Sequence, residues 1–113
     1  MDISLITQKD TADCVIVDPV TGKDTDIVIS LYGVSSSQYR NIARKLLADK
    51  SKDSVENDIE YLSVLTVGWE NIESGGKPLK FSPENARKVY EVSTIRGQVI
   101  QFIHDVRNFL PPR

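Results

Sequence analysis

The sequence predicts a single α+β domain over residues 1–113, with a β-hairpin or small antiparallel sheet followed by about four helices. Strand-like runs rich in Val and Ile fall within residues 1–34, the strand-rich part. Helical periodicity and capping signals fill residues 35–110, the helical part. Strands followed by helices are typical of α+β folds, and this length fits one domain.

Three short runs in the N-terminal part predict strands. They are "ISLIT" at residues 3–7, "DCVIVD" at 13–18 and "DIVISLY" at 26–32. The segment 19–25, "PVTGKDT", separates the last two and contains the turn residues proline and glycine. We therefore expect a hairpin with a loop longer than two residues. Because two strands alone are marginal in water, a third strand or a helical cover is also expected.

The first helix is predicted over about residues 36–49. Ser35 and Gln38 fit a capping box, in which side chains satisfy backbone groups of the first turn. Apolar residues then recur on one face at helical spacing, namely Tyr39, Ile42, Ala43, Leu46 and Leu47.

A second, longer helix is predicted from residue 54 to about residue 73. Asp53 and Glu56 give a second capping box at its start. Its apolar residues form two stripes, which indicates packing on more than one side. Gly75 and Gly76 are expected to end the helix by supplying left-handed backbone, and the proline that follows prevents its continuation.

Two further helices complete the prediction. Ser82 is the expected N-cap of the first, with Pro83 at the first helical position, and Ala86, Val89 and Tyr90 are expected to face inward. After a weak break at "VST", the last helix is predicted over about residues 94–110. Its apolar stripe consists of Ile95, Val99, Phe102, Ile103, Val106 and Leu110.

Composition narrows the classes of partner. The net charge of −2, from 14 basic and 16 acidic residues, gives no electrostatic reason to expect nucleic acid or an anionic membrane. Neither a signal peptide nor a membrane-spanning run is expected. The one cysteine, Cys14, forms no internal disulfide, which fits a reducing cytoplasmic setting.

The sharpest chemical pattern is the acidic run at residues 49–60. Ser54 stands where a calcium loop needs glycine, and Glu56 stands where it usually has an apolar residue. A polar break with a capped helix start is therefore favoured over a calcium-responsive module, which stays an alternative. The residues that match the calcium pattern are Asp49, Ser51, Asp53 and Glu60.

No enzyme signature is found. His104 is the only histidine and has no second ligand for a metal, so it is expected at the boundary of its helix. Cys14 is expected as a small core residue, and a pairing of Cys14 with His104 has no motif to support it. Residues 75–77 lack the spacing of a phosphate loop. No catalytic residue, cofactor or metal is therefore expected.

The phrase "VGWENI", a glycine turn and "KPLKFSPENARKVYE" together resemble the tail assembly chaperones of long-tailed bacteriophages. The likeness covers about residues 15–110 and is clearest over 64–90. The matching residues are Trp69, Gly76, Pro78, Leu79, Phe81, Ser82, Glu84 and Asn85.

The resemblance implies a non-enzymatic protein that binds the tape measure protein and helps recruit tail tube subunits. It implies a place in the host cell cytoplasm, absence from the mature virion, and a longer form made by ribosomal frameshifting after "LPPR". The matching residues, with Phe102 and Val106 of the last helix, are candidates for a structural motif or an interaction surface. Homo-oligomerisation stays open. A structural tail component, such as a connector or terminator subunit, and a small protein-interaction adaptor are the alternatives.

Overall fold

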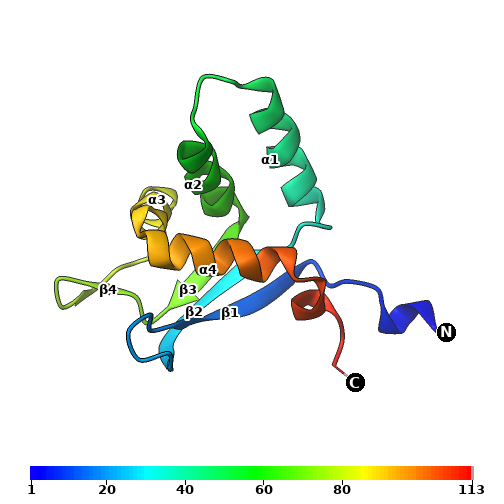
Figure 1. Cartoon of the computed structure of the whole chain (residues 1–113), viewed down its shortest axis with the longest axis horizontal. Helices are drawn as coiled ribbons and strands as arrows, with labels where there is room; N and C mark the ends of the chain where they lie inside the picture. The colour runs from blue at the N-terminus through cyan, green and yellow to red at the C-terminus, as the bar shows by residue number, and fades with distance from the viewer. Residues whose placement is uncertain (113) are drawn as a thin grey trace.

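A computed structural model describes residues 1–112 and places a three-stranded antiparallel sheet beneath a layer of helices (Figure 1). The α+β prediction is therefore confirmed. Along the chain the elements are η1 (Ile3–Leu5), β1 (Thr11–Val17), β2 (Asp24–Tyr32), α1 (Ser37–Ala48), α2 (Ser54–Leu65), β3 (Thr66–Glu70), β4 (Glu73–Ser74), β5 (Lys77–Pro78), α3 (Pro83–Glu91), α4 (Ser93–His104) and η2 (Val106–Phe109).

The sheet has the strand order β1-β2-β3, with β2 in the centre. Cys14 pairs with Ile29, and Ile29 pairs with Trp69 on the other side. Alternate residues of β1 and β2 are buried under the helices, and those between them are more exposed. This alternation is expected of an antiparallel sheet that is covered on one face. The predicted hairpin is confirmed, with the loop of residues 18–23 between β1 and β2.

The predicted long helix from residue 54 to about 73 is wrong in its second half. The helix ends at Leu65, and Thr66–Glu70 forms β3, which pairs with β2. The sequence "TVGWE" contains two β-branched residues, a glycine and a tryptophan, which favour a strand over a helix. The expected third strand thus comes from within the part of the chain that was predicted to be helical.

Gly75 and Gly76 do not end a helix, contrary to the prediction. They form the two-residue turn between β4 and β5, with φ values of 60° and 80°. Two consecutive positive φ values are the requirement of a tight hairpin turn, which glycine meets without steric cost. Asn71, with φ 66°, makes the preceding reversal after β3, and its side chain donates a hydrogen bond to the Asp26 carbonyl at 2.9 Å.

The N-terminal run at residues 3–7 is not a strand. Ile3–Leu5 is a single 3₁₀ turn capped by Asp2, and Ile3 is 74% exposed. No neighbouring strand lies beside this run among the described residues, so its β-prone side chains have no ladder to join.

The predicted helix starts hold in two places and shift in one. Asp53 and Ser82 cap α2 and α3 as predicted. Ser36, rather than Ser35, caps α1, because the buried Ser36 hydroxyl accepts from the Tyr39 N–H at 3.2 Å. Ser35 is exposed and its hydroxyl bonds to Gln8 instead.

The last predicted helix, 94–110, is two elements. α4 ends at His104, and Asp105 then caps the short η2 helix by accepting from the Arg107 N–H at 3.1 Å. The break turns Phe109 inward, where its ring fills the space beside Gly33, at 2.9 Å from the position of a Cβ atom there. Val106 of the predicted stripe is left exposed.

The core lies between the sheet and α2, α3 and α4. Within it, Tyr90 and Thr66 join their hydroxyls at 2.6 Å, and Thr66 also donates to the Leu62 carbonyl at 2.7 Å. The Thr66 hydroxyl has a single proton, which it donates to the Leu62 carbonyl, so the Tyr90 hydroxyl is the donor in the bond between Tyr90 and Thr66. The inward residues predicted for α3 and the core place of Cys14 are confirmed. The buried apolar residues are Cys14, Ile16, Ile29, Leu31, Ile42, Leu62, Leu65, Ile72, Ala86, Val89, Tyr90, Val99, Ile103 and Phe109.

Candidate functional site

The segment of residues 71–82, here called the strap, is held to the sheet by Trp69. The indole Nε1 of Trp69 donates a hydrogen bond to the Leu79 carbonyl at 2.8 Å. The Trp69 and Phe81 rings form a T-shaped contact with a centroid distance of 5.0 Å and an interplanar angle of 88°. The Leu79 N–H donates to the Ile72 carbonyl at 2.8 Å, so the strap closes on itself as well. Trp69 therefore holds the C-terminal end of the strap, and the backbone bond from Leu79 to Ile72 joins that end to the N-terminal end.

The residues after the strap build the start of α3. The Ser82 hydroxyl accepts from the Asn85 N–H at 3.0 Å, and the Asn85 side chain donates back to the Lys80 carbonyl at 2.8 Å. Glu84 lies in the first turn, where its charge complements the positive end of the helix dipole. These contacts give each polar residue of the motif a structural role.

Gly76 and Pro78 complete the motif in the β4–β5 hairpin, at its turn and in β5. The structure thus brings the residues from Trp69 to Asn85 together in one unit. Leu79 is half-buried beneath this unit, and Phe81 remains 39% exposed at its surface.

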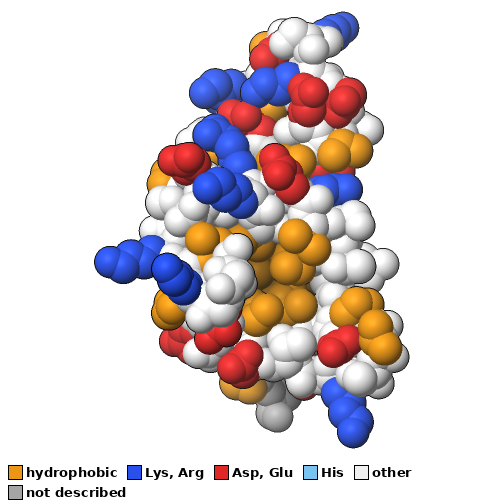
Figure 2. Space-filling model, turned by 90° about the vertical axis from the view of Figure 1, so that its left-hand side faces the viewer, with side chains coloured by type: hydrophobic (Ala, Val, Ile, Leu, Met, Phe, Trp, Pro, Cys, Tyr) orange, Lys and Arg blue, Asp and Glu red, His pale blue; other side chains and the backbone are white. Residues whose placement is uncertain are grey.

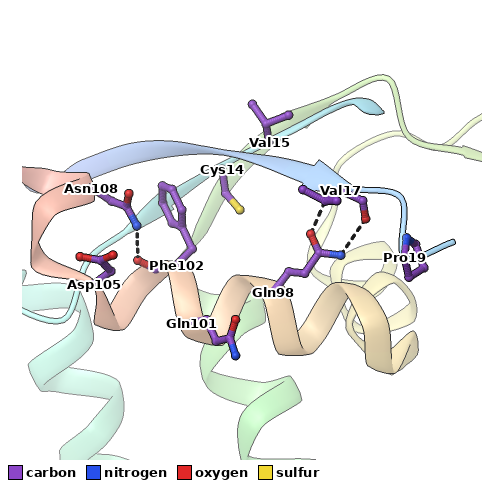
Figure 3. Close-up of a pocket in the computed structure, with 9 residues that line it drawn as sticks. All are labelled: Cys14, Val15, Val17, Pro19, Gln98, Gln101, Phe102, Asp105 and Asn108. Carbon is purple, nitrogen blue, oxygen red and sulfur yellow. Dashed lines mark hydrogen bonds between the residues drawn. The ribbon is translucent and has the colours of Figure 1, made fainter. Parts of the chain in front are cut away.

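Phe102 and Val106 lie elsewhere. Phe102 is half-buried, packs edge-on against Phe109 at 5.7 Å and lines a cavity beside β1 (Figure 3). Val106 is exposed in η2. The predicted stripe of the last helix therefore does not join the strap in one surface.

An apolar hollow of about 240 Å³ lies between the strap and the helices α3 and α4. Figure 2 looks onto this side of the molecule and shows hydrophobic side chains gathered in the middle of the face, with charged side chains around them. Val92, at the junction of α3 and α4, is 47% exposed here. The apolar side chains that line the hollow are Ile27, Ile72, Leu79, Val89, Val92 and Ile95.

Sequence reasoning found Leu79 but not the hollow. Ile27, Ile72 and Val92 are far apart in the chain, and only the pairing of β3 with β2 and the turn at Asn71 bring them together. The β-prone sequence of Thr66–Glu70 was the one signal in the chain that pointed to this surface, because a third strand there pairs with β2. Glu73 and Lys88 also line the hollow and add one charge of each sign.

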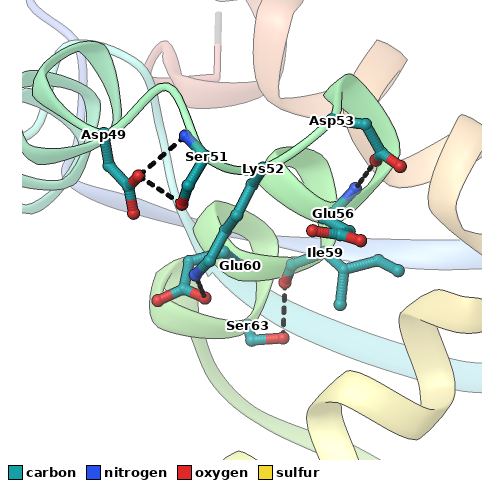
Figure 4. Close-up of polar contacts among 8 residues, drawn as sticks. All are labelled: Asp49, Ser51, Lys52, Asp53, Glu56, Ile59, Glu60 and Ser63. Atoms are coloured by element: carbon teal, nitrogen blue, oxygen red, sulfur yellow. Dashed lines mark hydrogen bonds and ion pairs between the residues drawn. The ribbon is translucent and has the colours of Figure 1, made fainter.

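The carboxylates that match the calcium pattern in residues 49–60 form hydrogen bonds and an ion pair with nearby residues of the same segment (Figure 4). Asp49 accepts from the Ser51 N–H and hydroxyl, at 2.9 and 2.6 Å, and these bonds lower the pKa of Asp49. Asp53 accepts from the Glu56 N–H at 2.8 Å as the α2 cap. The polar break and capped helix start predicted from the sequence are therefore confirmed.

Glu60, the last residue of the calcium pattern, pairs with the Lys52 ammonium at 2.8 Å. This hydrogen bond lowers the pKa of the Glu60 carboxyl below its ordinary value of 4.5. Within residues 1–112, no group of three or more His, Cys, Asp and Glu side chains is arranged to hold a metal ion.

Cys14 and His104, the remaining candidates for a chemical role, both lie in surroundings that give them structural roles. Burial raises the pKa of the Cys14 thiol to about 11, so the thiol is protonated at neutral pH, the opposite of an activated nucleophile. His104 is exposed, as expected of a boundary residue, with Nδ1 at 2.9 Å from the Ile100 carbonyl and its ring edge-on to Tyr39 at 6.4 Å.

No protein-family model, curated protein or solved structure matches the chain. Across the described part of the chain, no helix combines the length and the apolar character that a membrane crossing requires.

Proposed function

We propose that the protein is a non-enzymatic tail assembly chaperone of a long-tailed bacteriophage, which binds the tape measure protein and helps recruit tail tube subunits. One observation carries this proposal. Five of the eight residues that carry the resemblance lie in the strap, and the strap supplies a wall of the exposed apolar hollow through Ile72 and Leu79. Leu79 is thus both a residue of the motif and part of the candidate binding surface, and Trp69 holds it in place.

The hollow suits an amphipathic helix of the client. Helices bind in apolar grooves through a few anchor residues spaced one turn apart. A hollow of about 240 Å³ accommodates one or two such side chains, and Lys88 and Glu73 can pair with charges beside them. Because the Trp69 bond and the hairpin fix the strap, the wall is formed before the client arrives. A preformed site loses little entropy on binding.

The proposal is tested by co-expressing the tape measure protein of the same phage with this chain and with a Val92→Asp variant. Val92 is the N-cap of α4 and the C-cap of α3, and its side chain makes no capping bond. An aspartate there can cap α4, which stabilises by about 1 kcal/mol, while its charge opposes the dipole at the end of α3, so the two effects offset each other. The variant places a charge beside the hollow, and we expect it to lose the soluble complex with the tape measure protein while its own unfolding midpoint stays close to that of the wild type.

Val20→Asp is the matched control. Val20 lies in the loop between β1 and β2, is exposed and receives the same charge far along the chain from the strap. It should keep full rescue of the tape measure protein. If the wild-type chain neither solubilises nor co-purifies with the tape measure protein, or if it is found in finished virions, the chaperone proposal is wrong.

A further inference from the structure

β1 is an edge strand whose outer side is open. The Gly33 N–H donates to the Asp10 carbonyl at 2.9 Å, just before the first residue pair of the β1–β2 ladder. Bonded and non-bonded pairs alternate along an antiparallel ladder. The N–H and C=O groups of Thr11, Asp13 and Val15 therefore point away from β2. The 2.6 Å bond between the Asp13 and Ser30 side chains fits this, because side chains approach closest at non-bonded pairs.

Both ends of this open stretch are closed by the protein itself. At one end the Lys9 N–H donates to the Phe109 carbonyl at 2.6 Å. At the other end the Gln98 side chain accepts from the Val17 N–H at 2.8 Å and donates to the Val17 carbonyl at 2.9 Å (Figure 3). The Gln98 amide thus takes the place of a peptide group of a neighbouring strand. Within residues 1–112, no other hydrogen bond closes the outer side of β1 between these points.

A trough runs beside this edge. Two cavities of about 440 and 450 Å³ lie along β1 from Lys9 to Pro19, and Phe102 and Asn108 line both of them. Figure 3 shows Phe102 between β1 and α4, with Cys14 directed toward the helix. An added strand therefore has space for side chains on the helical side of the sheet.

The other edge of the sheet differs. β3 is five residues long, carries a bulge at its pairing with β2 and is followed directly by Asn71, which has a left-handed backbone conformation. Short length, bulges, prolines and lysines are the usual protection of sheet edges. Between Thr11 and Val15, β1 has a regular register and contains neither proline nor lysine. Its only charge is Asp13.

We propose that the β1 edge, over Thr11–Val15, binds an extended segment of a partner protein as a fourth strand. The segment carries apolar residues toward Phe102 and a Lys or Arg beside Asp13, because cross-strand pairs of opposite charge stabilise a sheet. This surface is separate from the apolar hollow, and the proposal does not depend on whether the protein is a tail chaperone.

A second copy of the chain fits this edge poorly. Antiparallel pairing of two β1 strands centred on Asp13 sets two carboxylates opposite each other, which destabilises the pair. Pairing centred on Val15 extends to Val17, where Gln98 already occupies the outer backbone groups. The Asp13 charge and the Gln98 bonds to Val17 therefore favour a basic segment of another protein over a second copy of the chain.

The test uses two synthetic heptapeptides in which valine alternates with lysine in one and with glutamate in the other. Amide shifts of the full chain in NMR titrations locate the site and give the dissociation constants. We expect the lysine peptide to shift the amides of Thr11, Asp13 and Val15 and to bind about tenfold more tightly than the glutamate peptide. Absence of shifts at these amides, or shifts confined to β3 or the hollow, would overturn the proposal.

Variants then distinguish strand addition at β1 from nonspecific binding of the peptides. Val15→Pro removes an N–H that points outward, so it leaves the β1–β2 ladder bonded and should abolish peptide binding. Val15→Thr keeps the N–H and should bind as the wild type does. Asp13→Lys should reverse the preference between the two peptides. This reversal decides the matter even if Val15→Pro fails to fold, since an unchanged preference would refute the role of Asp13.

Discussion

α1 and α4 are both 12 residues long and both carry an apolar stripe, but they are buried to very different extents. α4 lies along the sheet, and its Val99 and Ile103 are fully buried (Figure 1). α1 stands away from the sheet beside α2, and Ile42 is its only buried residue. The comparison teaches that an apolar stripe predicts a helix, whereas its burial depends on the neighbours that the rest of the chain supplies.

The neighbours explain the difference. α1 packs mainly on α2, for example through the edge-on contact of Tyr39 with Tyr61 at 6.3 Å. α4 meets β1, α2, α3 and η2 together. Segments with few buried apolar contacts open locally at a lower free energy than the core. We therefore expect α1 to open before the sheet and α4 do.

The largest expected effect comes from the same substitution made in both helices. Ile103→Ala removes a fully buried side chain and should lower the free energy of unfolding by about 4 kcal/mol. Ile42→Ala should cost about 2 kcal/mol, because the loosely packed surroundings of α1 can close the cavity. Urea unfolding of the two variants measures both values. Equal costs would show that α1 belongs to the same cooperative core as α4.

Trp69→Ala sharpens the comparison on the side of the sheet. It removes a half-buried ring, the bond to the Leu79 carbonyl and the contact with Phe81, so about 3 kcal/mol of stability should be lost. Thermal unfolding followed by circular dichroism provides the measurement. Near wild-type stability together with lost client binding would instead assign Trp69 to the binding surface alone.

The buried hydroxyl pair tests how tightly α3 is joined to the end of α2. Thr66→Val leaves the buried Tyr90 hydroxyl without an acceptor and should cost about 2 kcal/mol. Tyr90→Phe removes only the donor to Thr66, which keeps its bond to Leu62, and should cost about 1 kcal/mol. Chemical denaturation of both variants gives the ranking. The opposite order would mean that Tyr90 is not the donor.

The smallest expected effect is a pH dependence of the ion pair between Glu60 of α2 and Lys52, which lies in the connection from α1 to α2. Because the Lys52 hydrogen bond lowers the pKa of Glu60 below 4.5, its contribution to stability is present above that pH and is lost as the pH falls through the lowered value. The raised pKa of Lys52 keeps the pair intact until the pH exceeds 10.5. Both side chains keep contact with water, so the effect is small.

Glu60→Gln provides the measurement for this pair. Its unfolding midpoint should lie slightly below that of the wild type at pH 7, and the difference should shrink as the pH falls below 4.5 and through the lowered pKa of Glu60. A constant difference across this range would exclude the ion pair as its cause.

The sequence predicted those elements whose signals are local. Asp53 and Ser82 are followed by residues that complete a cap, so the starts of α2 and α3 were predicted correctly. Thr66–Glu70 was mistaken for helix because its apolar spacing fits both periods, and pairing with β2 decided the outcome. The ladder hydrogen bonds that decide it connect residues far apart in the chain.

The candidate site was predictable only in part. Trp69, Leu79 and Phe81 were among the candidate motif residues identified from the sequence, and in the structure Trp69 contacts the other two. The hollow beside them depends on Ile27 and Val92, which carry no motif and become neighbours only in the folded chain. A surface assembled from separate segments of ordinary apolar residues leaves no local pattern to detect.

The buried thiol of Cys14 is a natural probe of how often the sheet opens. As the only cysteine, 3% exposed and with a pKa raised to about 11, it meets an alkylating reagent at neutral pH only when β1 moves away from the helices. The labelling rate of the unmodified protein therefore reports how often the sheet opens, with no engineered probe. A strand added beside β1 would lower the alkylation rate of Cys14, and local opening of α1 would leave this rate unchanged.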